Sequence, residues 1–178
     1  MRNTHRKAIA RVSALVLILA LVLSFSASLA EATFKSTGAG VKYNGSTIKL
    51  GAYTTSAKLK KAFGSWSSRK TDNGCTCGYA TYLYTFKSRG IVVETLQKKK
   101  GDKNEKIITI TVTKSTVPTI AGLKVGNKTS VLAKKYGTKC SRSGSKVLYK
   151  SGKYYMKIYT KTKNGSRVIT KIEFILDL

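Results

Sequence analysis

The sequence predicts an α+β fold made of two tandem repeats, each a short N-terminal helix followed by about three antiparallel strands, packed as one unit. A segment of the pattern apolar-Lys-apolar-Gly occurs twice, at residues 48–51 and 123–126, and each copy precedes a short helix-like stretch that ends at a glycine. Runs rich in β-branched and aromatic residues then follow in both halves, several with the period-two alternation of a strand. The same order of elements occurring twice indicates an internal repeat.

The first 32 residues are predicted to be a signal peptide. Residues 1–11 are basic, residues 12–23 are largely apolar, and Ala30-Glu31-Ala32 matches the pattern of a cleavage site. We expect cleavage after Ala32, with Ala30 as the second choice, which leaves an exported chain without a transmembrane segment. The alternative is a retained membrane anchor, because a slightly longer apolar run approaches the roughly 18 residues of a membrane span.

Composition argues against catalysis and against metal binding. The chain has 34 Lys and Arg residues against 7 Asp and Glu; residues 1–32 hold four and one of these, so the remaining 146 residues carry 30 against 6, a formal charge of +24. The only histidine, His5, lies in the removed segment. Imidazole and carboxylate groups carry most acid–base chemistry and bind most metals. We therefore expect no enzymatic activity, no cofactor and no metal site.

Each repeat is expected to contain one helix and three strands. Threonine can cap the start of a helix and glycine can end it, which predicts helices over residues 54–63 and 129–136. Their apolar stripes are Leu59, Ala62 and Phe63 in the first helix, and Val131, Leu132 and Tyr136 in the second. The predicted strands are 81–86, 91–97 and 106–113 in the first repeat, and 146–149, 154–160 and 167–176 in the second.

Turns and the single proline set the limits of the repeats. Asn44-Gly45 predicts a hairpin that pairs residues 41–43 with 46–48 ahead of the first helix, and Asn164-Gly165 predicts another between the last two strands. Pro118 marks the joint. We therefore expect repeat 1, with its N-terminal hairpin, at residues 33–116 and repeat 2 at residues 117–178.

The second repeat carries a pattern that resembles a known family. Residues 119–126 (TIAGLKVG), a short helix ending at Tyr136-Gly137, and an aromatic strand pair ending in residues 167–172 (RVITKI) resemble the β-lactamase-inhibitor-protein-like domain, whose pattern outer-membrane assembly lipoproteins of the SmpA/OmlA type share. The tandem arrangement is closer to the inhibitor, and the resemblance covers about residues 48–174. It implies a fold and a mode of binding, through a sheet surface, with no target attached.

The chain is also similar to uncharacterised secreted proteins of Gram-positive gut bacteria, in which a Cys-Gly-Tyr-x-Tyr stretch precedes a Gly-Ile-x-Ile-Gly repeat. Here Cys77-Gly78 and the tyrosines Tyr82 and Tyr84 stand in for that stretch. This resemblance implies a secreted, extracellular protein associated with the cell envelope of a Gram-positive bacterium.

Three cysteines, an odd number, follow the signal segment. We expect a disulfide from Cys140 to Cys75 or Cys77 that joins the two repeats and leaves one thiol over. The alternatives are a small, strained Cys75–Cys77 ring and three reduced thiols.

Alternation along the last two strands predicts a basic and aromatic binding face. If Val168, Thr170, Ile172, Phe174 and Leu176 face the core, then Ile169, Lys171, Glu173 and Ile175 face outward. On the neighbouring strand Tyr154, Met156 and Ile158 would point inward, which leaves Tyr155, Lys157, Tyr159 and Lys161 outward. A second basic group, Lys98, Lys99, Lys100 and Lys103, is expected at a hairpin tip. The alternative is an ordinary exposed sheet face and a solvated loop.

These observations predict a secreted, non-catalytic binding protein. Its charge favours anionic cell-envelope polymers or an anionic lipid surface, held through the Tyr/Lys face by interactions that weaken with salt. The alternative, implied by the resemblance, is an inhibitor or adaptor that grips a specific protein partner through the tandem sheet. Nucleic acid is a possible partner by charge alone.

Overall fold

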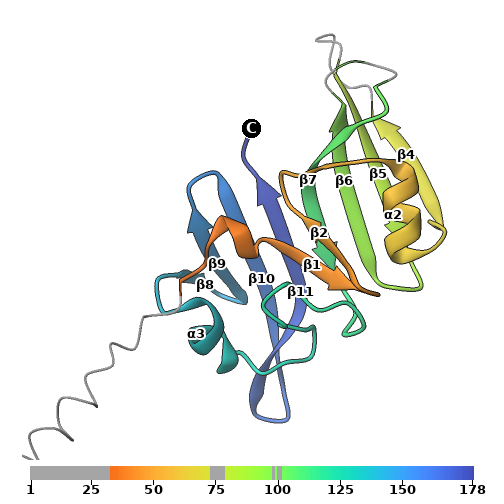
Figure 1. Cartoon of the computed structure of the whole chain (residues 1–178). Helices are drawn as coiled ribbons and strands as arrows, with labels where there is room; N and C mark the ends of the chain where they lie inside the picture. The colour runs from red at the N-terminus through yellow and green to blue at the C-terminus, as the bar shows by residue number, and fades with distance from the viewer. Residues whose placement is uncertain (1–32, 73–78, 98, 100–101) are drawn as a thin grey trace, which may run out of the picture. The chain divides into compact units, whose positions relative to one another are not determined.

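One antiparallel sheet dominates the computed structural model of the chain (Figure 1). The structure describes residues 33–178 except 73–78, 98, 100 and 101. In that part of the chain the strands lie in the order β4-β5-β6-β7-β11-β10-β9-β8, with β3 beside β7. They are β3 (Tyr53–Thr54), β4 (Ser68–Asp72), β5 (Ala80–Phe86), β6 (Ile91–Gln97), β7 (Glu105–Val112), β8 (Ser141–Ser143), β9 (Lys146–Ser151), β10 (Tyr154–Lys163) and β11 (Ser166–Leu176).

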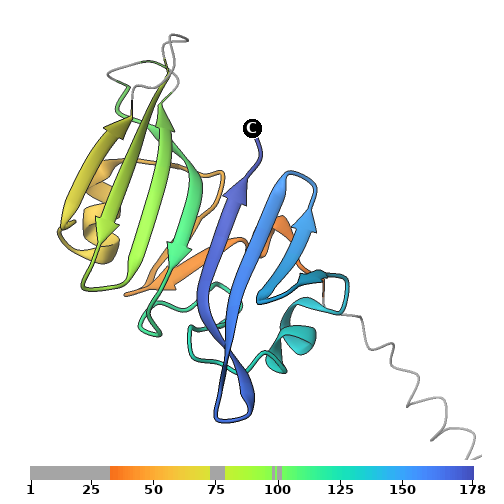
Figure 2. The same cartoon turned by 180° about the vertical axis from the view of Figure 1, so that it is seen from behind.

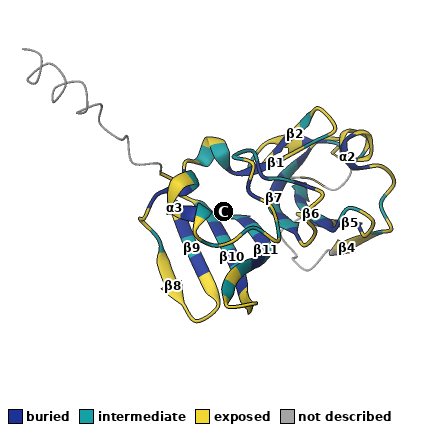
Figure 3. Ribbon diagram, turned by 90° about the horizontal axis from the view of Figure 1, so that it is seen from below, coloured by how far each residue is buried: buried dark blue, intermediate teal, exposed yellow. Residues whose placement is uncertain are grey.

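The predicted α+β class is wrong. Among the described residues, helix is confined to α2 (Ser56–Phe63), α3 (Val131–Tyr136) and the 3₁₀ turn η1 (Ser36–Gly38), against nine strands in the main sheet. Each half of the sheet contributes four strands to the order above, where about three were predicted. The edge strands β4 and β8 were missed because their sequences, SRKTD and SRS, are polar throughout and give no alternation of apolar residues. β8 is exposed along its whole length (Figure 3).

The two helices are short because local signals bound them closely. The Thr55 hydroxyl accepts a hydrogen bond from the Lys58 backbone N–H (3.2 Å) at the start of α2. Gly64 ends α2 with φ +87° and Gly137 ends α3 with φ +76°, a region that favours glycine.

A layer of short elements covers one face of the sheet. The Phe63 ring of α2 lies 5.1 Å from the Phe86 ring of β5, and the Tyr136 ring of α3 lies 5.7 Å from the Tyr149 ring of β9. The helices therefore cover different ends of the sheet. The hairpin of β1 (Gly40–Tyr43) and β2 (Ser46–Lys49) packs on the same side and forms a two-stranded sheet of its own (Figure 1).

Matching hydrogen bonds relate the two halves of the sheet. The Gly51 N–H donates to the Ile107 carbonyl of β7 (2.8 Å), and the Gly126 N–H donates to the Ile169 carbonyl of β11 (2.8 Å). The return bonds also correspond, from the Ile107 N–H to Ala52 and from the Ile169 N–H to Asn127. The repeated apolar-Lys-apolar-Gly segments thus take the same place beside the last strand of each half.

The central pairing of β7 with β11 shows the same equivalence between the two halves of the sheet. Its pairs are Ile172 with Val112, Glu173 with Thr111, Phe174 with Ile110, and Ile175 with Thr109. When each residue of β7 is exchanged with its counterpart in β11, the pair Ile172–Val112 becomes the pair Phe174–Ile110, and the pair Glu173–Thr111 stays the same. An approximate two-fold axis therefore passes beside Thr111 and Glu173, at the middle of the sheet.

A β-bulge in each of these strands changes which side chains face the core. The register shifts leave Ile108 of β7 and Thr170 of β11 as extra residues. Each extra residue reverses the inward and outward alternation of the side chains that precede it in the strand. Ile169 therefore points into the core, where it is 1% exposed. The prediction that Val168 and Thr170 face the core and Ile169 faces outward is therefore wrong, whereas Ile172, Phe174 and Leu176 are buried as predicted.

Buried residues from both halves form a single core between the sheet and the covering elements. Residues Ala32–Leu178 make one compact unit. The division into repeats at residue 116 stays a prediction, and the predicted signal peptide lies outside the described residues. No helix in the described part of the chain is long and apolar enough to cross a membrane.

The central pairing predicts where the fold is most sensitive to truncation. Phe174→Ala removes a fully buried ring beside the two-fold axis and is expected to lower the free energy of unfolding by about 3–5 kcal/mol. The matched change Leu83→Ala, at a residue 36% exposed, is expected to cost less than about 1 kcal/mol. Urea unfolding of both variants checks this, and equal losses would contradict the assignment of the core.

Candidate binding face

The face of the sheet opposite the covering layer is the candidate functional site. Figure 2 shows this side of the sheet with no described segment in front of it. The antiparallel register places side chains on this face in rows that cross the whole sheet. One row is Ser141, Leu148, Lys157, Glu173, Thr111, Val92, Thr85 and Ser68; the next is Lys150, Tyr155, Ile175, Thr109, Glu94, Leu83 and Lys70. We call this surface the open face.

The structure places four of the predicted site residues on one side of β10, and Lys99 and Lys103 lie apart from them. Tyr155, Lys157 and Tyr159 are half-buried on the open face, on the opposite side of β10 from the buried Met156 and Ile158. Lys161 is exposed further along β10, beyond the bulge. Lys99 and Lys103 are exposed in the β6–β7 connection. Lys98 and Lys100 lie outside the described residues.

Neighbouring strands hold Tyr159 in a network of charged groups. The ammonium of Lys171 lies 3.8 Å from the centre of the Tyr159 ring, and that of Lys146 lies 5.7 Å from it. The Tyr159 hydroxyl donates to Glu173 Oε2 (3.0 Å), and Lys171 pairs with Glu173 Oε1 at 3.5 Å. These cation–π and charged contacts hold the ring in place before any ligand binds.

Tyr155 borders a shallow hollow at one end of the open face. The Lys150 ammonium lies 5.2 Å from the centre of the Tyr155 ring, and its hydrogen bond with Tyr155 raises the pKa of Lys150. The hollow has a volume of about 520 Å³ and is lined by Leu148, Tyr155, Lys157, Ile175, Leu176, Asp177 and Leu178. Aromatic, aliphatic and ammonium groups thus meet at one place, a combination suited to receiving a side chain of a partner molecule.

The open face offers non-covalent contacts. Its polar groups are lysines, glutamates, hydroxyl groups of serine and threonine, and tyrosines, and no imidazole is present to activate a hydroxyl nucleophile. Among the described residues, no three His, Cys, Asp or Glu side chains gather as they would around a metal ion.

Sequence reasoning missed a buried polar cluster on the covered side of the sheet. Glu105 is 3% exposed and accepts hydrogen bonds from the Tyr84 hydroxyl (2.7 Å) and the Thr95 hydroxyl (2.6 Å). Arg69 donates from Nε to the Tyr84 oxygen (3.1 Å), and its guanidinium lies 4.1 Å from the centre of the Tyr82 ring. Burial, and then Glu105, raise the pKa of Tyr84. No local motif points to this cluster, because register alone brings together Arg69 and Glu105 and the hydrogen-bonded residues that are 10 to 21 positions apart.

The predicted disulfide stays a prediction because Cys75 and Cys77 lie outside the described residues. Cys140 is half-buried beside Tyr149 of β9, whose hydroxyl donates to the Gly137 carbonyl (3.2 Å). Burial, and then the nearby Cys140 thiol, raise the pKa of Tyr149 to about 12.

Comparisons of the chain with protein-family models, with curated proteins and with solved structures returned no match.

The buried cluster predicts that alanine substitution at two glutamates on neighbouring strands lowers the free energy of unfolding by very different amounts. Glu105→Ala leaves two buried hydroxyl groups without their acceptor and is expected to lower the free energy of unfolding by about 3 kcal/mol or more. Glu94→Ala, on the open face of β6, is expected to cost about 0.5 kcal/mol or less. Chemical denaturation of both variants at neutral pH measures the difference, and a silent Glu105→Ala would show that the cluster is not held as described.

The raised pKa of Tyr149 predicts how part of the folding stability changes at alkaline pH. Its pKa is near 10 in the unfolded chain and about 12 in the folded one, so its contribution is complete below pH 10 and disappears as the pH rises through 12. Tyr149→Phe is therefore expected to lose stability less steeply than the parent between pH 10 and 12. Urea midpoints measured across that range check this; parallel curves would contradict it.

Proposed function

We propose that this chain is a non-catalytic binding protein that holds a protein partner on the open face of its sheet. The observation that supports the proposal is the continuous row of side chains across eight strands, with apolar, aromatic and charged groups that the described chain leaves uncovered. Export, as predicted from residues 1–32, would place this face outside the cell.

The size of the open face fits a protein partner. Eight strands spaced about 4.8 Å apart span roughly 34 Å, and five to six residues along each strand add about 18 Å. The projected area is therefore on the order of 600 Å², close to the roughly 800 Å² that each partner buries in a standard interface.

The chemistry of the open face favours a partner with apolar groups toward one side and acidic groups toward the other. Ile175 lies on the central strand β11, and Val92 and Leu83 lie on β6 and β5 toward the β4 edge, whereas Lys146, Lys150 and Lys157 gather on β9 and β10. Tyr155 and Tyr159 lie among these lysines, and tyrosine is enriched at the residues that dominate binding energy in interfaces. Binding through tyrosine rings that are already held in place keeps its affinity in moderate salt.

A second candidate is the one that the charge predicts, an anionic polymer held on the same face. The observation in its favour is the group of lysines beside Tyr155 and Tyr159. Against it, Glu94 and Glu173 lie on this face, and several of its ammonium groups already contact tyrosine rings or Glu173. Such binding would be mostly counterion release and would fall steeply with salt.

Tyr155→Ser combined with Tyr159→Ser tests the two candidates. The purified protein, without residues 1–32, is immobilised and exposed to envelope and secreted-protein fractions of a Gram-positive bacterium, then washed up to about 1 M salt, where the screening length is about 3 Å. We expect one protein to remain on the parent, and the double variant to bind that protein at least about a hundredfold more weakly, because two aromatic anchors are lost.

Tyr43→Ser is the matched control, because Tyr43 is a half-buried tyrosine of the covering hairpin. It is expected to retain the partner. Retention of wall polymer that disappears with salt, and that the double variant weakens by about threefold to tenfold, would instead favour the second candidate. Unchanged binding of every ligand by the double variant would remove the Tyr155–Tyr159 surface from both.

A further inference from the structure

The covering layer carries a charge distribution unlike that of the sheet. We use the name for residues 33–50, 55–64, 113–125 and 130–140. They lie over the buried side of the sheet, except Thr113 and Lys114, which border the open face beside Thr85 and Val92. These segments contain no arginine and no carboxylate. Their eleven lysines are Lys35, Lys42, Lys49, Lys58, Lys60, Lys61, Lys114, Lys124, Lys134, Lys135 and Lys139.

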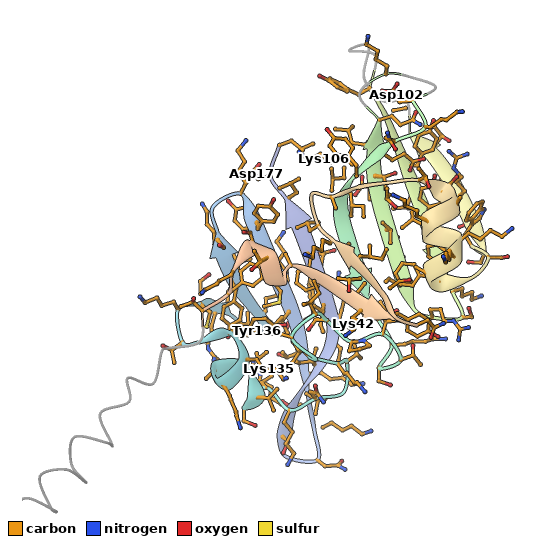
Figure 4. All side chains as sticks on the ribbon, in the orientation of Figure 1. Lys42, Asp102, Lys106, Lys135, Tyr136 and Asp177 are labelled. Atoms are coloured by element: carbon orange, nitrogen blue, oxygen red, sulfur yellow. The ribbon has the colours of Figure 1, made fainter. Side chains whose placement is uncertain are left out.

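All six carboxylates that follow residue 32 belong to the sheet or its connections. Asp72 lies in β4, Glu94 in β6, Glu105 in β7 and Glu173 in β11, while Asp102 and Asp177 lie in the β6–β7 connection and just after β11. Figure 4 shows Asp102 and Asp177 toward one end of the sheet, and Lys42 and Lys135 on the covering layer away from that end. The segregation of charge is therefore a property of the fold.

Within the described part of the chain, no ion pair involves a lysine of the covering layer. Ten of the eleven are exposed; Lys135 is half-buried and donates to the Ala121 carbonyl (2.7 Å). The ion pairs of the described residues, Arg69–Glu105 and Lys171–Glu173, both lie on the sheet. Free ammonium groups gathered on one face repel one another and attract an anionic partner.

These lysines extend across most of the width of the sheet. Those of α2 lie at the end over β5 and those of α3 lie at the end over β9, with Lys42 and Lys49 of the covering hairpin between them (Figure 1). Five strand spacings separate β5 from β9, which is about 24 Å. A partner that contacts all three groups must therefore be extended, with charges repeated along its length.

The other side chains of the layer narrow the partner further. The large exposed apolar side chains of the described residues are Tyr53, Tyr79, Leu83 and Leu178, and all four lie outside the covering layer. The half-buried ring of the layer, Tyr43, already stacks on Phe63 (6.1 Å between ring centres) and lies under the Arg89 guanidinium (5.4 Å). The described residues of the layer therefore include no exposed large apolar side chain on which bases could stack or that could insert among lipid chains. Lysine, unlike arginine, binds phosphate as a point charge with little demand on geometry.

From these observations we infer that the covering layer binds a flexible, linear phosphodiester polymer that carries no bases. This surface is separate from the open face, so the inference goes beyond the proposed protein partner and does not depend on it. One molecule would bind such a polymer on one side of its sheet and a protein on the other.

The test compares variants that remove the same number of charges from different places. The covering-layer variant is Lys42→Gln, Lys49→Gln, Lys60→Gln and Lys134→Gln; the hairpin control is Lys99→Gln, Lys103→Gln, Lys161→Gln and Lys163→Gln; the open-face variant is Lys70→Gln, Lys146→Gln, Lys150→Gln and Lys157→Gln. Binding of purified poly(glycerol phosphate) is measured by calorimetry between about 50 and 200 mM salt, where electrostatic affinity changes most visibly.

We expect the covering-layer variant to bind the polymer at least about tenfold more weakly at low salt, with the slope of log K against log salt reduced by about 3. The hairpin control is expected to stay within about threefold of the parent, as is the Tyr155→Ser, Tyr159→Ser variant. If the Tyr155→Ser, Tyr159→Ser variant still binds the protein partner, the proposed function is contradicted and the inference about the covering layer is unaffected.

Three results would overturn the inference. Equal losses in the covering-layer variant and the hairpin control would show a response to net charge without a site. A larger loss in the open-face variant would place the polymer on the opposite side of the sheet. Tighter binding to phosphatidylglycerol vesicles, or to single-stranded DNA at matched charge, would identify a membrane or a nucleic acid as the preferred partner.

Discussion

The pairing of β7 with β11 is the constraint on which the rest of the structure depends. It joins two four-stranded halves that would each be small for an independent core, and its register fixes which residues of β4 share a row with those of β8. The approximate two-fold axis beside Thr111 and Glu173 follows from that register. A slip of one residue would turn Phe174 out of the core and break both the buried layer and the rows of the open face.

Local sequence signals were enough to place several elements. Terminal glycines located both helices, together with the Thr55 cap of α2, and alternation of apolar residues located β5, β6 and β7 closely. The fold class was missed because two short helices count for little beside nine strands, and because β4 and β8 carry no apolar pattern. The inward and outward assignment failed at Ile169 because an extra residue in a strand is visible only against its partner strand.

The candidate site was predictable along one strand and not across strands. Alternation alone put Tyr155, Lys157 and Tyr159 on one side of β10. Their neighbours Lys146 and Glu173 come from strands whose register is set by the central pairing and by the bulge at Thr170, so no local pattern could reveal them. The Arg69–Glu105 cluster was missed for the same reason.

The lysine ammonium groups on the two sides of the sheet have different kinds of neighbours. On the open face an ammonium finds a tyrosine ring or Glu173 within the chain, so bringing a partner there displaces few counterions. On the covering layer no lysine takes part in an ion pair of the described residues, and their mutual repulsion opposes folding until salt or a polyanion neutralises it. A chain with +24 after residue 32 can therefore present one face with little dependence on salt and another dominated by it, because its carboxylates are confined to the sheet.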